Sequence, residues 1–245
     1  MKITIAKSLD DFYKQSAERI ASKIIEKPKS IIGLSTGRTT GGIHKALVEL
    51  YREKPFDTSQ VTVFGLDEVT NISRECKASC YWLLLNQVVE PLGIPLSNFI
   101  MPDPYAKDLQ SECRKFEDRV SNDNASDLQM LGIGENGHIG FNQPGTPFGS
   151  TTWISYLDDS LDERLRRENN IAPDVKMGGL TLGIKNIMWS KKIVLVASGK
   201  NKADIIEKAL FGPVSEDVPA SVLQLHPDCE AILDPEAAQQ IVKHL

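Results

Sequence analysis

The stretch MLGIGENGHIGFNQPG, residues 130–145, carries an apolar run directly into a loop of glycines, and the fold can be worked out from it. An apolar run that ends in glycine is typical of a buried strand followed by a ligand-binding loop. Glycine allows positive φ and lets the backbone approach a ligand closely. The side chains Asn136, His138, Asn142 and Gln143 add hydrogen-bonding groups. We favour a binding loop over the alternative, a tight turn in which the histidine bonds only to neighbouring backbone.

A strand, a polar loop and a helix also follow one another earlier in the chain. Residues 30–34 predict a buried strand, residues 35–42 are rich in Gly, Ser and Thr, and a helix is expected over 43–52. Anions bind at helix N-termini, so this loop is a candidate phosphate site. It matches neither the P-loop nor the GxGxxG pattern, so a nucleotide is not indicated. The alternative is a turn in which Thr39 or Thr40 caps the helix.

Two further polar loops follow predicted strands. The strand over residues 60–66 ends at Asp67, a carboxylate that serves either as a general base or as the cap of a turn. The strand over 192–197 runs into a loop that ends in Lys202 and opens another helix. Carboxyl ends of parallel strands share one edge of a sheet, where ligands bind. We therefore expect four loops to converge there, at Thr36, Asp67, His138 and Lys202.

The alternation of strands and helices predicts an α/β fold with a three-layer, doubly wound, mostly parallel sheet of Rossmann-like type. The chain has 245 residues, 41% of them hydrophobic, which suits a single domain spanning 1–245. A mixed charge run over 162–168 predicts a solvated helix in which one arginine can face an anion. Residues 236–244 predict a closing helix, and His44 and His244 are expected at the surface.

Composition excludes several classes of protein. The net charge is -5 with both signs spread along the chain, which argues against a nucleic-acid or anionic-membrane surface. No apolar run approaches the length of a membrane span, and residues 1–6 alternate like a strand rather than a signal peptide, so we expect a cytoplasmic protein. Four scattered cysteines without a CxxC pair suggest neither a zinc site nor a disulfide framework.

The motifs together resemble the glucosamine-6-phosphate deaminase/isomerase family from residue 32 to about 234. Two stretches, 88–94 and 178–188, are more similar to its galactosamine-6-phosphate branch. The matching segments are GLSTGRT (33–39), LDE (66–68), LGIGENGHIGFN (131–142), SGKNK (198–202) and PASVLQLH (219–226).

This resemblance implies an enzyme that isomerises a hexosamine 6-phosphate and releases ammonia. Asp67 would move the proton between C2 and C1, and His138, which stands with Asn136 and Gln143, would open the sugar ring. The resemblance implies no metal and no nucleotide cofactor, and a sugar phosphate as the partner. The implied phosphate ligands are Ser35, Thr36, Gly37, Arg38, Thr39 and Lys202, with Arg167 from a mobile lid over about 143–170. His226 falls in a matching segment and is interpreted as structural.

The chain departs from the family pattern at several positions. Gln143 stands where the family usually has a glutamate that supports the histidine, and Asn136 stands where many members have an acidic residue. A neutral amide orients an imidazole but does not stabilise its protonated form by charge. Trp153 and Ser155 stand where allosterically activated relatives have basic residues, so no second sugar-phosphate effector site is expected.

Two other functions remain open on the sequence. A 6-phosphogluconolactonase has a similar fold, but this chain lacks the arginine that such enzymes carry after the pair at Asp67 and Glu68. A non-catalytic sugar-phosphate sensor would keep the anion site without acid-base chemistry, which the retained Asp67 and His138 disfavour. The C4 epimer of the substrate and the oligomeric state stay open, although relatives of this family are often homo-oligomers.

Overall fold

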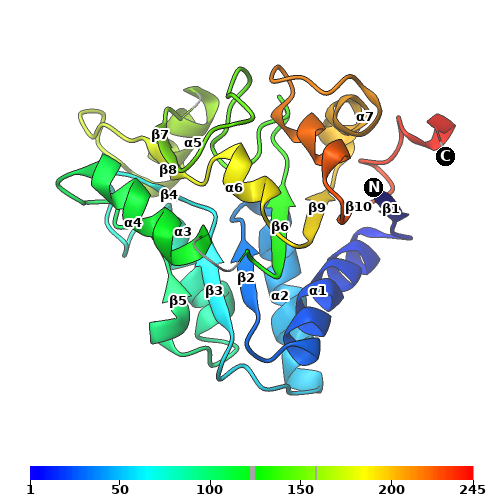
Figure 1. The fold of residues 1–245 in the computed structure, drawn as a ribbon, viewed down its shortest axis with the longest axis horizontal. Coiled ribbons are helices and arrows are strands. Elements are labelled where there is room, and N and C mark those ends of the chain that lie inside the picture. The colour runs from blue at the N-terminus through cyan, green and yellow to red at the C-terminus, as the bar shows by residue number, and fades with distance from the viewer. Residues whose placement is uncertain (122–124, 158, 245) are drawn as a thin grey trace.

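A parallel sheet forms the centre of the computed structural model, which describes residues 1–121, 125–157 and 159–244 (Figure 1). Within these ranges the sheet has seven strands, and every neighbouring pair is parallel. The predicted fold class, doubly wound and α/β in one domain, is confirmed. In spatial order the strands are β1 (Lys2–Ile5), β10 (Cys229–Leu233), β9 (Ile193–Ala197), β6 (Leu128–Gly132), β2 (Ile31–Leu34), β3 (Thr62–Gly65) and β5 (Phe99–Ile100).

Two hydrophobic clusters cover the two faces of this sheet and make the three layers. Strand β9 contributes side chains to both clusters, since Leu195 belongs to one cluster whereas Val194 and Val196 belong to the other. Successive side chains of a strand point to opposite faces, so a parallel strand buried on both faces is apolar throughout. One face is covered by α1 (Leu9–Glu26), α2 (Arg38–Glu53), α3 (Cys80–Leu84) and the π-helical turn η1 (Leu85–Val89). The other is covered by α4 (Leu109–Ser121), α6 (Ile184–Met188), α7 (Ala203–Phe211) and the 3₁₀ helix η4 (Pro219–Leu225).

A small antiparallel sheet, which the sequence analysis did not predict, lies above one end of the main sheet beside α5 (Asp159–Asn169) in Figure 1. It forms because the chain leaves the main sheet after β3. The N–H of Leu66 still bonds to Leu34 O of β2 at 3.0 Å, and Leu66 O then accepts from the N–H of Leu182 at 3.0 Å. Asp67 is therefore the first residue of the second sheet. Its strands are β4 (Asp67–Val69), β8 (Gly179–Thr181) and β7 (Trp153–Ser155), with β8 in the middle.

Two expectations about the elements were wrong. Residues 236–244 do not form one closing helix, since only the 3₁₀ turn η5 (Val242–His244) is helical there. Ala237 and Ile241 are nevertheless fully buried against the main core. The spacing of apolar residues in this segment therefore indicated which side chains are buried, but not that the segment is helical. The helix after the first Gly-rich loop begins at Arg38 rather than at residue 43.

His44 is a core residue rather than a surface one. It lies on the buried face of α2, with a relative exposure of 0%, and its Nδ1 is 2.9 Å from Gln87 Oε1 of η1. Burial lowers the pKa of His44 to about 4, so the ring is neutral near pH 7. His226 is structural as expected, because it is buried and its Nε2 lies 2.7 Å from Ser190 O.

Among the described residues, no helix has both the length and the hydrophobicity that a membrane span requires.

Candidate active site

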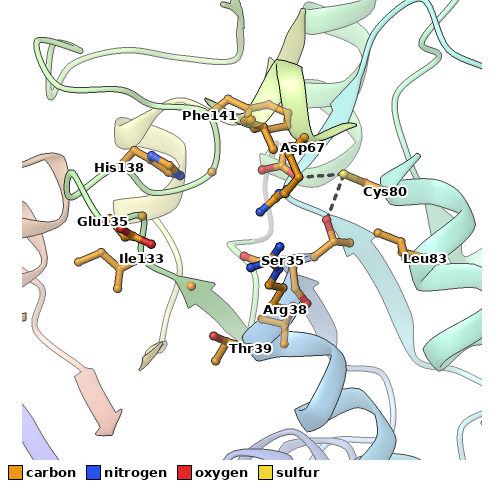
Figure 2. Close-up of a pocket in the computed structure, with 18 of the residues that line it drawn as sticks. Ser35, Arg38, Thr39, Asp67, Cys80, Leu83, Ile133, Glu135, His138 and Phe141 are labelled. Carbon is orange, nitrogen blue, oxygen red and sulfur yellow. Dashed lines mark hydrogen bonds between the residues drawn. The ribbon is translucent and has the colours of Figure 1, made fainter. Parts of the chain in front are cut away.

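The four predicted loops do converge on one cavity, at the carboxyl edge of the main sheet (Figure 2). Thr36, Asp67, His138 and Lys202 all line this cavity, whose volume is about 850 Å³. A cleft of this size accommodates a small phosphorylated metabolite. The prediction that strand ends bring these side chains together is therefore confirmed.

The N-terminus of α2 forms one wall of the cavity. Gly37 occupies the N-cap position with φ of 152° and has no side chain with which to cap the helix. The alternative of a Thr cap is wrong, since Thr39 and Thr40 lie inside the first turn and Thr40 Oγ1 donates to Gly37 O at 3.3 Å. The first N–H groups of the helix therefore lie at the cavity wall, where the helix dipole favours an anion. The predicted phosphate ligands that line the cavity here are Ser35, Thr36, Gly37, Arg38 and Thr39.

Two cationic side chains face this anion site from other elements. Lys202 ends the 3₁₀ turn η3 (Lys200–Lys202), and burial lowers the pKa of its ammonium. Glu135 raises that pKa by its charge, whereas Arg164 of α5 lowers it, so the three groups are close enough to interact. Arg164 lines the cavity and was not singled out from the sequence.

Arg167, the arginine singled out from the sequence, is exposed and is not among the cavity-lining residues. Helix geometry explains the difference. Leu161, Arg164 and Leu165 are spaced i, i+3 and i+4, so they share the face of α5 that lines the cavity. Arg167 lies off this stripe. The apolar spacing of the two leucines was the signal that would have identified the arginine on the inner face.

The same face of α5 contacts the phosphate loop. Glu168 continues the stripe, and its Oε1 lies 3.5 Å from Arg38 Nη2. Both side chains are largely exposed, so this ion pair contributes little to stability. It does show that α5 reaches across the mouth of the cavity to α2.

Asp67 is the buried carboxylate that lines the cavity. Its relative exposure is 7%, and its Oδ1 accepts a hydrogen bond from Cys80 Sγ at 3.5 Å. Cys80 Sγ in turn accepts from Thr36 Oγ1 at 3.1 Å, as the dashed lines in Figure 2 show. Burial raises the pKa of Asp67 to about 7, the Cys80 bond lowers it, and the charge of Glu68 raises it. A carboxylate that titrates near neutral pH is suited to general-base catalysis.

Glu68, the next residue, points away from the cavity into the protein. Its side chain is fully buried and accepts from Ser79 Oγ at 3.0 Å and from the backbone N–H groups of Val69, Cys80 and Tyr81 at 2.8 Å each. Burial raises its pKa, and the four hydrogen bonds oppose that shift. Glu68 therefore holds the N-terminus of α3, which places Cys80 beside Asp67.

His138 belongs to a chain of hydrogen bonds through two amides. Asn136 Oδ1 accepts from the backbone N–H of His138 at 3.1 Å and lies 2.8 Å from its Nδ1. Because a backbone N–H only donates, the Asn136 atom that faces the ring is the oxygen, and Nδ1 carries a proton. In the neutral ring Nε2 is then the acceptor nitrogen. Asn136 Nδ2 donates to Gln143 Oε1 at 2.9 Å, so Gln143, which does not line the cavity, acts through Asn136.

Trp153 and Ser155 of β7 hold the loop that follows His138. Trp153 Nε1 donates to Asn142 Oδ1 at 2.9 Å, and Ser155 Oγ donates to Phe141 O at 2.7 Å. The sequence analysis did not predict this supporting role. Within the described ranges, no group of three or more His, Cys, Asp or Glu side chains is arranged to hold a metal ion.

A family model described as glucosamine-6-phosphate isomerases/6-phosphogluconolactonase matches residues 5–232, which is most of the chain. The chain belongs to this family. The glucosamine-6-phosphate deaminase of Clostridium novyi (strain NT) is 39% identical to this chain. The match covers 98% of this chain and 100% of the relative. The protein of that name from Lachnoclostridium phytofermentans is 40% identical over 95% of this chain and 98% of the relative.

Solved structures agree with the family assignment. The solved structure of a monomeric glucosamine-6-phosphate deaminase of the NagB superfamily superposes on this chain with a TM-score of 0.93 at 35% identity. The match covers 98% of this chain and 100% of the solved chain. The 6-phosphogluconolactonase of Leishmania guyanensis has a TM-score of 0.76 at 18% identity, with 98% of each chain covered. At that identity the likeness shows the shared fold alone.

Replacing the buried carboxylate of Asp67 with a neutral amide is expected to stabilise the protein by an amount that depends on pH. Because burial raises the pKa of Asp67 from 3.8 to about 7, the native state keeps a proton that the unfolded chain releases. The stability contributed by the protonated group is full below pH 3.8 and is lost as the pH rises through about 7. We expect Asp67→Asn to be more stable than the wild type, by a margin that grows by about 3 kcal/mol between pH 5 and pH 8.

Chemical denaturation at the two pH values measures this margin, with Asp217→Asn as the control at an exposed carboxylate. A margin for Asp67→Asn that does not change with pH would contradict the assignment of a raised pKa.

Proposed function

We propose that this protein is a glucosamine-6-phosphate deaminase that converts its substrate and water to a ketohexose 6-phosphate and ammonia. The observation that carries the proposal is the meeting of Asp67, His138 and the anion-binding end of α2 in one cavity. Full-length relatives named glucosamine-6-phosphate deaminase support the gluco substrate over its galacto epimer. The family resemblance of the sequence alone left both open.

Substrate binding uses the charge of the phosphate. The phosphate group sits at the N-terminus of α2, where the Thr36 and Thr39 hydroxyls and the Lys202 ammonium provide further donors. Arg164 and the segment that contains α5 close over it, in keeping with a mobile lid over about 143–170; residue 158 of this segment lies outside the described residues. With the phosphate held at one end, the sugar extends toward Asp67 and His138.

Ring opening comes first, since the pyranose has no free carbonyl. His138 is held with its Nδ1 proton on Asn136 Oδ1, so Nε2 exchanges the proton between the C1 hydroxyl and the ring oxygen. An imidazole suits this step because it gains and loses a proton near neutral pH. Opening yields a C1 aldehyde next to the C2 carbon that bears the amine.

Proton transfer between C2 and C1 follows. Asp67 takes the C2 proton, the C–H electron pair forms a C1–C2 double bond, and the C1=O π bond breaks as the aldehyde oxygen takes a proton from the substrate's own C2 ammonium. The proton on Asp67 then returns to C1 while the nitrogen lone pair forms a C2=N bond, which leaves an iminium at C2. Water adds to C2 and the nitrogen leaves as ammonia, which produces the ketone. The pKa of Asp67 near 7 lets its carboxylate accept this proton and give it back.

A lactonase and a sensor are less well supported. The 6-phosphogluconolactonase structures that resemble this chain do so at under 20% identity. A sensor has no use for a buried base, which lowers stability at neutral pH without contributing to binding.

Ammonia release tests the proposed reaction. Glucosamine 6-phosphate and galactosamine 6-phosphate are supplied side by side, and ammonia is followed with a coupled reporter enzyme. We expect turnover of the gluco substrate, with kcat in Asp67→Asn lower by about a thousandfold because the base is lost. Turnover of the galacto epimer alone would change the substrate assignment, and binding without any turnover would support a sensor.

Gln143 is expected to set the pH range of the reaction. In Gln143→Glu the carboxylate still accepts from Asn136 Nδ2, and its charge stabilises the imidazolium of His138, which raises the pKa of the ring. We expect the pH optimum of kcat to be higher in Gln143→Glu than in the wild type, with faster ring opening.

The matched control is Gln110→Glu, which makes the same change at an exposed position of α4. A pH-rate profile that Gln143→Glu leaves unchanged would rule out this role for the amide.

Arg164 and Arg167 make a direct comparison on one helix. Because Arg164 lines the cavity and Arg167 is exposed, we expect Arg164→Ala to raise KM for the sugar phosphate by about tenfold and Arg167→Ala to change it little. A larger rise in KM for Arg167→Ala than for Arg164→Ala would instead support Arg167 as the phosphate ligand, as the family resemblance implied. It would also mean that α5 rotates when substrate binds.

The assembly and the location of the protein stay predictions. The solved relative described as monomeric supports a monomer over the homo-oligomer that the family resemblance allowed. A cytoplasmic location agrees with a metabolic sugar phosphate as substrate.

A further inference from the structure

Cys80 stands between the phosphate loop and the base. It is the first residue of α3 and is 4% exposed, and its thiol reaches the cavity wall. Its Sγ is 3.1 Å from Thr36 Oγ1 on one side and 3.5 Å from Asp67 Oδ1 on the other (Figure 2). These two contacts connect the anion site to the carboxylate that acts on C2.

The direction of the two hydrogen bonds follows from the groups involved. An ionised carboxylate only accepts, so the S–H proton points to Asp67, and the Thr36 hydroxyl donates to the sulfur. Burial and the charges of Asp67 and Glu68 raise the pKa of the Cys80 thiol well above its usual value. The thiol therefore stays protonated and remains a donor.

We propose that Cys80 is a positioning residue that holds Asp67 Oδ1 against the phosphate loop and leaves Oδ2 to act on the substrate. This inference rests on the proposed function. Asp67 Oδ2 points toward Gly140, a cavity-lining residue, where an added Cβ would lie 3.4 Å from it. The carboxylate thus has one oxygen bound to the protein and one directed at the cavity.

Cys80 is the uncharged group that hydrogen-bonds to Asp67 and lowers its pKa. Among the described elements, those packed most closely on β4 are β8, which consists of Gly, Leu and Thr, and α3, whose titratable residues are Cys80 and Tyr81. The Tyr81 ring stacks on Phe99 instead. Glu68 is occupied by its four donors. The other charged or ionisable groups that line the cavity with Asp67 and Cys80 are Tyr13, Arg38, Glu135, His138, Arg164 and Lys202.

A thiol suits this position because it is a weak donor. A hydroxyl would make a shorter and stronger bond to the carboxylate, which would favour the ionised form and lower its basicity. No donor at all would leave Oδ1 unbound and the carboxylate free to rotate. Cys80 keeps Asp67 oriented and still basic near pH 7.

The test compares the pH dependence of kcat/KM in the wild type, Cys80→Ala and Cys80→Ser. Asp67 must be ionised to accept the C2 proton, so activity rises as the pH passes its pKa. Cys80→Ala removes a bond that lowers this pKa, and we expect the acid limb to move up by about one pH unit. Cys80→Ser strengthens the bond, and we expect the acid limb to move down.

Cys229→Ala is the matched control, because Cys229 is also 4% exposed but belongs to β10 and does not line the cavity. We expect it to leave the pH profile unchanged. If Cys80→Ala does not fold, Cys80→Ser, which keeps a donor of similar size, still gives a shift of defined sign. Acid limbs that coincide in the wild type and both Cys80 variants would overturn the proposal, even if kcat falls.

A second measurement separates this inference from the proposed function. Carboxyl ¹³C NMR titration of Asp67 in the substrate-free protein reports its pKa without turnover. Opposite shifts in Cys80→Ala and Cys80→Ser support the positioning role even if neither hexosamine phosphate is turned over, in which case the proposed function alone fails. No shift in either variant refutes the role of Cys80.

Discussion

The buried carboxylate of Glu68 is the interaction on which the geometry of the cavity depends. An ionised group without solvent is costly unless hydrogen bonds replace its water, and Glu68 receives four of them. Three come from backbone N–H groups, two of which belong to the first turn of α3. The carboxylate therefore joins β4 to α3 and completes the hydrogen bonding of a helix end in one contact.

Asp67 has the opposite environment from its neighbour, although the two residues are adjacent in the chain. Glu68 has four donors, whereas among the described residues the donor to Asp67 is the weak thiol of Cys80, and burial raises the pKa of Asp67 to about 7. Alternation along β4 explains the contrast, because successive side chains of a strand point to opposite sides. One carboxylate supports the structure, and the other remains basic at a cost in stability that is common at functional sites.

Two neutral amides connect to Nδ1 of His138. Gln143 acts on Asn136, and Asn136 on His138 Nδ1, so the orientation and tautomer of the ring are set without a negative charge in this chain of contacts. A carboxylate in either place would hold the same geometry and also stabilise the imidazolium. Orientation and charge are thus separable here, because an amide and a carboxylate have the same shape but different charge.

Local patterns predicted much of this protein. Apolar strands that end in glycine predicted the parallel sheet, its three layers and the meeting of Thr36, Asp67, His138 and Lys202, since strand ends of a parallel sheet share an edge. Residues 236–244 show the limit of apolar spacing, which reports burial whether or not the segment is helical. His44 was misplaced because a single polar residue on a buried helix face does not disturb the apolar pattern around it.

The sequence by itself determined the fold class and the chemistry of each loop, because strand and helix periods and helix-end signals act over a few residues. Only the tertiary structure decided which side chains touch. It brought Cys80 of α3 between Thr36 and Asp67, and it turned Arg164 rather than Arg167 into the cavity. Such contacts join residues far apart in the chain and depend on the angle at which one element packs on another, which no local pattern encodes.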